Sequence, residues 1–92
     1  MKDFYSYGAI FTKEKIGYSV NFPDLIGCYS EGDTLQEAKN NCKEALEGFL
    51  YLLELDNGKI PEATNINEIQ ANKDQIVIPI EIDMKIVREE MK

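Results

Sequence analysis

The sequence contains no histidine and only two cysteines, and these shortages exclude several kinds of chemistry. A structural zinc site uses about four cysteine or histidine ligands, so Cys28 and Cys42 are too few to form one. Without a histidine as general base, the two thiols also lack the usual activator of a nucleophilic cysteine. We therefore expect Cys28 and Cys42 to be buried, reduced thiols.

Long apolar runs are also missing. No stretch approaches the roughly 18 uninterrupted apolar residues that mark a membrane helix. The N-terminal residues, which include Asp3 and Tyr5, lack the apolar segment of a signal peptide. We therefore expect a cytoplasmic protein without a membrane partner.

Acidic residues are absent from the first predicted strand, residues 4–12. Metal-dependent nucleases hold two magnesium ions with carboxylates that cluster inside a sheet. Three acids do lie close in sequence, but each has an alternative role in a turn or a helix cap: Asp24, Glu31 and Asp33. The chain also has no phosphate-binding loop and no glycine-rich dinucleotide turn. The sequence therefore predicts no enzymatic activity, no cofactor and no metal site.

Acids outnumber bases by 17 to 10, which gives a formal net charge of −7. A negative domain repels the phosphates of nucleic acids at long range, so we expect no general nucleic-acid binding. The charge suits a basic protein partner, and it also suits an acidic surface that serves solubility alone. Composition leaves both interpretations open.

The most regular pattern predicts a helix over residues 35–55. Thr34 and Glu37 have the spacing of a capping box, in which the hydroxyl of Thr34 accepts from the amide of Glu37 and the carboxylate of Glu37 accepts from the amide of Thr34. Asn57 and Gly58 tolerate the left-handed conformation that ends many helices. Apolar residues recur at spacings of three and four, which predicts one buried side: Leu35, Ala38, Cys42, Ala45, Leu46, Phe49, Leu52 and Leu53.

Alternating apolar residues predict four strands: residues 4–13, 18–22, 25–30 and 76–82. The first two form an antiparallel hairpin, and Pro79 places the fourth at a sheet edge, because proline donates no ladder hydrogen bond. A right-handed crossover through the helix would make the fourth strand parallel to the first. The predicted class is α+β: three antiparallel strands, one long helix packed on the sheet and the strand order third, second, first, fourth. Short helices are also predicted within residues 65–70 and 83–92.

Four segments, in this order and directly after a hairpin, carry a family resemblance: Phe22-Pro23-Asp24-Leu25, Gly27-Cys28, Glu31-Gly32-Asp33-Thr34-Leu35-Gln36-Glu37-Ala38 and Lys43-Glu44-Ala45-Leu46. Together they resemble the HicB antitoxin-like domain of HicAB toxin–antitoxin systems. The similarity spans about residues 4–82 and implies a truncated ribonuclease H-like fold. We therefore assign residues 1–82 to a HicB-like domain and residues 83–92 to a short C-terminal tail.

The resemblance also implies a partner. HicB antitoxins neutralise HicA, a small basic ribonuclease with a double-stranded-RNA-binding-like fold and a catalytic histidine, and the expected mechanism is blockage of its RNA-binding and catalytic surface. Opposite charges would speed association, and apolar anchors would supply most of the affinity. The candidate contacts surround the turns: Asp24, Tyr29, Glu31 and Asp33. The alternative location is the outer side of the helix: Glu37, Glu44 and Glu47.

The predicted tail differs from the family pattern. Many HicB antitoxins continue into a C-terminal helix-turn-helix or ribbon-helix-helix module that binds the operator, whereas residues 83–92 balance three bases against three acids. We therefore expect no DNA binding by this chain. An orphan HicB-like domain that binds another protein or a small ligand is the alternative function, and a homo-oligomer is compatible with either.

Overall fold

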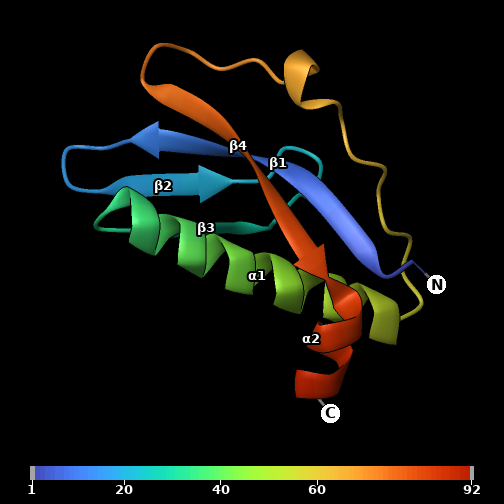
Figure 1. The fold of residues 1–92 in the computed structure, drawn as a ribbon. Coiled ribbons are helices and arrows are strands. Elements are labelled where there is room, and N and C mark those ends of the chain that lie inside the picture. Colours follow the sequence, from blue (N-terminus) through green and yellow to red (C-terminus); the bar gives the residue numbers. More distant parts are fainter. Residues whose placement is uncertain (1, 92) are drawn as a thin grey trace.

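The computed structural model describes residues 2–91 and contains a four-stranded sheet, two α-helices and one 3₁₀ turn (Figure 1). The elements and their bounds follow in chain order: β1 Phe4–Lys13, β2 Tyr18–Asn21, β3 Tyr29–Gly32, α1 Leu35–Leu55, η1 Ile66–Glu68, β4 Gln75–Asp83 and α2 Met84–Glu90. This architecture confirms the predicted α+β class and the predicted bounds of α1. Within residues 2–91, neither helix is long and apolar enough to cross a membrane.

The strand order is β3-β2-β1-β4, as predicted, and every neighbouring pair is antiparallel. The prediction that β4 runs parallel to β1 is therefore wrong. The cause is the connection over residues 56–74, which leaves the end of α1 and carries the chain past η1 to the far end of β1 (Figure 1). There the amide of Lys13 donates to the carbonyl of Asp74 at 2.9 Å, so β4 begins beside the end of β1 and returns along it. The ribonuclease H-like assignment stays a prediction.

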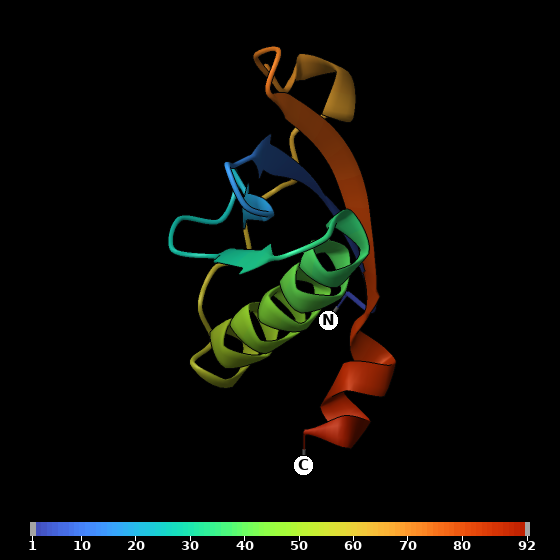
Figure 2. The same ribbon diagram turned by 90° about the vertical axis from the view of Figure 1, so that its left-hand side faces the viewer.

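One side of α1 packs against one face of the sheet (Figure 2). Its buried residues recur every four positions, and each is 0% exposed: Ala38, Cys42, Leu46 and Leu50. Leu50 completes this series, although it was not among the residues predicted to be buried. Leu52 was predicted to be buried, but it is 62% exposed, because two further residues rotate its position by about 200° around the helix. The facing core side chains come from three strands: Tyr7, Ala9, Phe11, Val20, Ile80 and Ile82.

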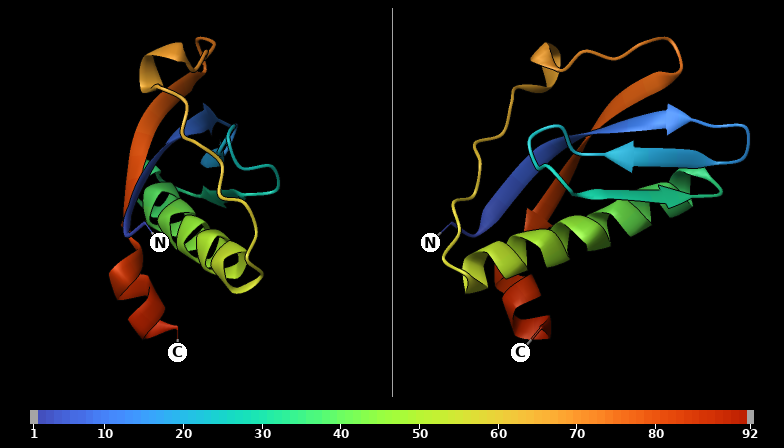
Figure 3. Two further views of the ribbon diagram at one scale, coloured as in Figure 1. Left: turned by 90° about the vertical axis from the view of Figure 1, so that its right-hand side faces the viewer. Right: turned by 180° about the vertical axis from the view of Figure 1, so that it is seen from behind.

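The third strand begins later than predicted, because residues 22–28 fold into turns that join β2 to β3 (Figure 3). The amide of Leu25 donates to the carbonyl of Phe22 at 3.0 Å, and the amide of Cys28 donates to the carbonyl of Leu25 at 3.0 Å. Gly27 has a φ of 93°, a left-handed conformation that favours glycine. Two apolar residues of the predicted strand, Leu25 and Cys28, point into the core from these turns, whereas Ile26 is exposed.

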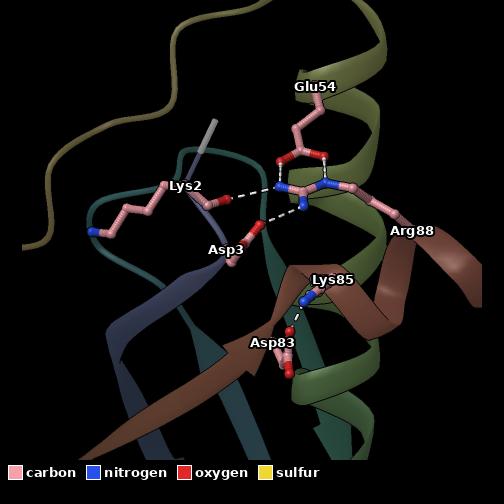
Figure 4. Close-up of polar contacts among 6 residues, drawn as sticks. All are labelled: Lys2, Asp3, Glu54, Asp83, Lys85 and Arg88. Atoms are coloured by element: carbon pink, nitrogen blue, oxygen red, sulfur yellow. Dashed lines mark hydrogen bonds and ion pairs between the residues drawn. The ribbon is translucent and has the colours of Figure 1, made fainter.

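The helix α2 is fastened to the rest of the domain by apolar and ionic contacts. Two of its side chains lie in the core: Met84 and Val87. The guanidinium of Arg88 donates to both carboxylate oxygens of Glu54 at 2.9 and 2.8 Å and to the carboxylate of Asp3 at 2.8 Å (Figure 4). A further bond at 2.7 Å reaches the carbonyl of Lys2. Arg88 therefore joins α2 to the end of α1 and to the start of the chain.

Candidate interaction surface

Two of the predicted contact residues lie side by side on β3. Side chains two residues apart share a face of a strand, so Tyr29 and Glu31 point the same way, and both are exposed, Tyr29 by 72%. Opposite them in the register are Asn21 and Ser19, which flank the buried Val20 that faces α1. Tyr29 and Glu31 therefore lie on the sheet face that α1 leaves uncovered, at the edge of the sheet.

The third predicted contact, Asp33, is exposed between β3 and the start of α1. The amide of Glu37 donates to the hydroxyl of Thr34 at 3.1 Å, which confirms this half of the predicted capping box. The carboxylate of Glu37 accepts from the amide of Asp33 at 3.1 Å rather than from that of Thr34. The carboxylate of Asp33 adds negative charge close to the positive end of the helix dipole, where it is stabilising.

The fourth predicted contact, Asp24, has a different role from the others. It is half-buried, and its carboxylate accepts from the amide of Thr64 at 2.9 Å and from the hydroxyl of Thr64 at 2.5 Å. These bonds tie the turn after β2 to the connection that leads to β4. Asp24 therefore holds two loops together and does not project freely from its turn.

The outward side of α1 presents a second candidate surface. At about 100° per residue, six residues fall within a sector about 80° wide, opposite the buried side. We call this sector the outer stripe: Glu37, Asn41, Glu44, Gly48, Leu52 and Leu55. Its N-terminal part is polar and acidic, whereas its C-terminal part exposes 62% of Leu52 and 60% of Leu55. Exposed leucines beside carboxylates are typical of a surface that a protein partner covers.

Sequence reasoning missed the apolar members of this region. Leu52 was assigned to the buried side, although strict counting at 3.6 residues per turn separates it from Leu46 and Leu50. Ile26 was assigned to a strand, but it is 94% exposed in the turn. A β-carbon built on the neighbouring Gly27 would lie 3.9 Å from Cε2 of Phe49. Ile26 therefore projects from a turn that lies against α1.

Charge is distributed unevenly around α1. Partial burial raises the pKa of Glu47, nearby Lys43 lowers it, and the carboxylates of Glu90 and Glu44 raise it further. Glu47 is thus the meeting point of acids from α1 and α2 on one flank of the outer stripe. Lys43 lies one turn before Glu47 on the same flank but farther round from the outer stripe, where it lines a hollow of about 590 Å³ together with Phe4, Glu81 and others.

Both outer edges of the sheet are modified against pairing with another strand. The bond from Lys13 to Asp74 shows that odd-numbered residues of β1 bond toward β4. The pair Gly8–Pro79 is therefore non-hydrogen-bonded, so the nitrogen of Pro79 faces the outer edge, where proline offers no donor. At the opposite edge, the side-chain amide of Asn41 donates to the backbone carbonyl of Glu31 at 2.9 Å. Such features limit edge-to-edge association.

The buried groups offer little reactive chemistry. Cys28 and Cys42 are free and buried, as predicted. Burial raises the pKa of each thiol to about 11, so both stay protonated and poorly nucleophilic near neutral pH. Within residues 2–91, no three cysteine, aspartate or glutamate side chains gather into a metal-binding group.

The chain is similar to a known protein family and to individual known sequences. Residues 7–92 match the model of the "HicB_like antitoxin of bacterial toxin-antitoxin system". The chain is 35% identical over 81 residues to an uncharacterised 14.9 kDa protein from the rep-hol intergenic region of Haemophilus phage HP1. That match covers 85% of this chain and 61% of the phage protein, so the chain spans less than two thirds of this relative's length.

Two solved structures share the fold. A toxin–antitoxin complex from Streptococcus pneumoniae matches with a TM-score of 0.80 and 20% identity, over 95% of this chain and 72% of the other. A complex described as HicA3 and HicB3 matches with a TM-score of 0.71 and 22% identity, over 86% of this chain and 99% of the other. At these identities the structural likeness establishes the fold alone.

Proposed function

Because the chain belongs to the HicB-like antitoxin family of bacterial toxin–antitoxin systems, we propose that it neutralises a small basic ribonuclease of the HicA type. Binding would cover the RNA-binding and catalytic surface of the toxin. The observation that carries this proposal is the combination of negative charge with exposed apolar side chains on two sides of the domain, Tyr29 on the open face of the sheet and Leu52 on the outer side of α1. We place this activity in the cytoplasm, where the RNA that such a toxin cleaves is found.

The negative charge and the exposed apolar side chains have separate physical roles. The net charge of −7 would attract a basic toxin and raise the association rate, most strongly at low salt. Exposed apolar side chains would supply most of the affinity once they are buried at the centre of the interface. The negative charge also keeps the antitoxin away from the RNA itself, so inhibition would come from covering the toxin and not from competing for substrate contacts.

The test is RNA cleavage by the HicA-type protein of the same host, titrated with this chain. We expect cleavage to fall to background at one antitoxin per toxin, and cleavage of the same RNA by an unrelated ribonuclease to be unaffected. Loss of both activities would indicate RNA shielding and would contradict the proposed mechanism. Undiminished cleavage by the toxin at a tenfold excess of this chain would overturn the proposed function and favour an orphan domain with another ligand.

We also propose that this chain does not bind duplex DNA at physiological salt. Affinity for DNA depends on lysine and arginine contacts that release phosphate counterions, and Arg88 is already engaged by two carboxylates. A gel shift with the promoter upstream of its own reading frame provides the test. A retarded band at nanomolar protein and 150 mM salt would contradict this expectation.

A further inference from the structure

Gly48 occupies a position in α1 where the fold itself does not require glycine. Glycine is the least favourable residue in a helix interior after proline, so a glycine there is commonly explained by close packing. Here a β-carbon built on Gly48 would meet no other atom within 4 Å, apart from the local helix backbone and its chain neighbours. By contrast, a β-carbon on Gly32 would lie 2.4 Å from the backbone nitrogen of Ala38. Gly32 is needed inside the domain, whereas Gly48 is not.

The surroundings of Gly48 indicate what approaches it. Gly48 lies at the centre of the outer stripe, between the carboxylate of Glu44 one turn earlier and the exposed side chain of Leu52 one turn later. On one flank, the turn that exposes Ile26 lies against Phe49. On the other flank, α2 is held close by the bond from the hydroxyl of Tyr51 to the carbonyl of Met91 at 3.3 Å. The bare helix backbone at Gly48 is thus bordered by acidic and apolar side chains.

The distribution of charge along the outer stripe decides between two occupants. A second copy of α1 in parallel orientation would place Glu37 and Glu44 against their own counterparts, which is repulsive. In antiparallel orientation it would place these carboxylates against Leu52 and Leu55. The carboxylates would then lose water without gaining a positively charged partner, which is unfavourable. A basic protein with an apolar contact residue satisfies both halves of the stripe. Charge complementarity therefore favours a basic partner over a second copy of this chain.

We propose that the outer stripe of α1 is the docking surface for the basic toxin, with Gly48 as the point of closest approach. This inference rests on the proposed function and specifies where it is carried out. Leu52 and Leu55 are the apolar anchors, and Glu37 and Glu44 provide the ionic contacts that fix orientation. Tyr29 and Glu31, on the opposite face of the sheet, lie outside this docking surface.

The test measures the affinity of variants of this chain for the HicA-type protein of the same host, inactivated at its catalytic histidine, by calorimetry. Gly48→Gln adds a long side chain at the proposed point of closest approach, and we expect its affinity to fall by about 30-fold or more, as for an interface hot spot. Leu52→Gln is the second variant, and its affinity for the toxin should also fall. Lys43→Gln, on another side of α1, is the matched control and should bind as the wild type does.

The outcomes separate the two proposals. Wild-type affinity in folded Gly48→Gln and Leu52→Gln proteins would overturn the docking surface while leaving the proposed function intact. If the wild-type chain itself shows no binding, the proposed function fails and the docking surface fails with it. Circular dichroism and urea unfolding verify that each variant is folded. A β-carbon at Gly48 would meet no other atom, and Leu52 is exposed. We therefore expect both variants to be at least as stable as the wild type.

Discussion

The two sides of α1 differ in what they need from the rest of the chain. On the inner side, four residues are fully buried, and Gly32 of β3 approaches the helix so closely that a methyl group would collide with its backbone. On the outer side, Gly48 has free space and Leu52 is 62% exposed. The inner side therefore determines the fold, and the outer side is available for a partner. Substitutions on the two sides should accordingly affect different measurements.

The largest contrast should come from the leucines at positions 50 and 52. Leu50 is 0% exposed, so Leu50→Ala should lower the free energy of unfolding by about 2–5 kcal/mol through the cavity it leaves. Leu52→Ala should change it by no more than about 0.5 kcal/mol, as is usual for exposed positions. Urea unfolding followed by circular dichroism measures both. Equal losses in the two variants would mean that the helix is rotated relative to the sheet.

The two glycines provide the next contrast. Gly32→Ala should destabilise the protein by about 1–3 kcal/mol, because its β-carbon would collide with backbone that moves only with the helix. Gly48→Ala should stabilise it by about 0.5–1 kcal/mol, because alanine is the better helix former and meets no obstruction. Thermal and urea unfolding of both variants measure the difference. A destabilised Gly48→Ala protein would reveal an internal contact at the outer side.

The N-cap of α1 should contribute a smaller amount to the free energy of unfolding, independent of the inner and outer sides of the helix. Thr34→Ala removes the hydroxyl that accepts from the amide of Glu37, and we expect a loss of about 1 kcal/mol in the free energy of unfolding. Thr34→Ser keeps the acceptor and is the control. A loss in the serine variant as large as that in the alanine variant would assign the effect to the methyl group and not to the cap.

The smallest effect should depend on pH. Partial burial raises the pKa of Glu47, so the folded state holds its proton more tightly than the unfolded state does. Stability from this group is present below its ordinary pKa and is lost as pH rises through the raised value. Glu47→Gln should therefore stabilise the protein at pH 7, by no more than about 0.5 kcal/mol, and have no stabilising effect below pH 4. Unfolding curves at the two pH values test this; a larger gain in acid would reverse the assignment.

The sequence predicted those features that depend on local spacing. The bounds of α1, the role of Thr34 and the edge position of Pro79 follow from capping, periodicity and the missing proline donor, and the structure confirms all three. The direction of β4 was not predictable in this way, because it depends on the path of residues 56–74. That path is held in part by the bonds between Asp24 and Thr64, forty positions apart in the chain.

The exposed residues of the candidate surface were predicted only in part, because exposure also depends on how the elements pack together. Acidic residues near turns are visible in a sequence, and Glu31 and Asp33 are indeed exposed. Whether an apolar residue of a helix is buried depends on how the helix is rotated against the sheet. Leu50 and Leu52 are only two residues apart, yet Leu50 is buried and Leu52 is exposed. Asp24 was named as a contact for its charge and its place in a turn, and that contact stays a prediction; its bond to Thr64 was not visible in the sequence. Exposure, unlike secondary structure, is a property of the assembled fold.

The most direct test of the account is carboxyl footprinting of this chain, free and bound to the inactivated HicA-type toxin. A water-soluble carbodiimide labels exposed carboxylates, and mass spectrometry reads the labelling at each residue. We predict strong protection of Glu37 and Glu44 in the complex, with labelling unchanged at Glu31 and at the exposed Glu81 of β4. Protection of Glu31 with unchanged labelling of Glu37 and Glu44 would contradict it and place the toxin on the open face of the sheet.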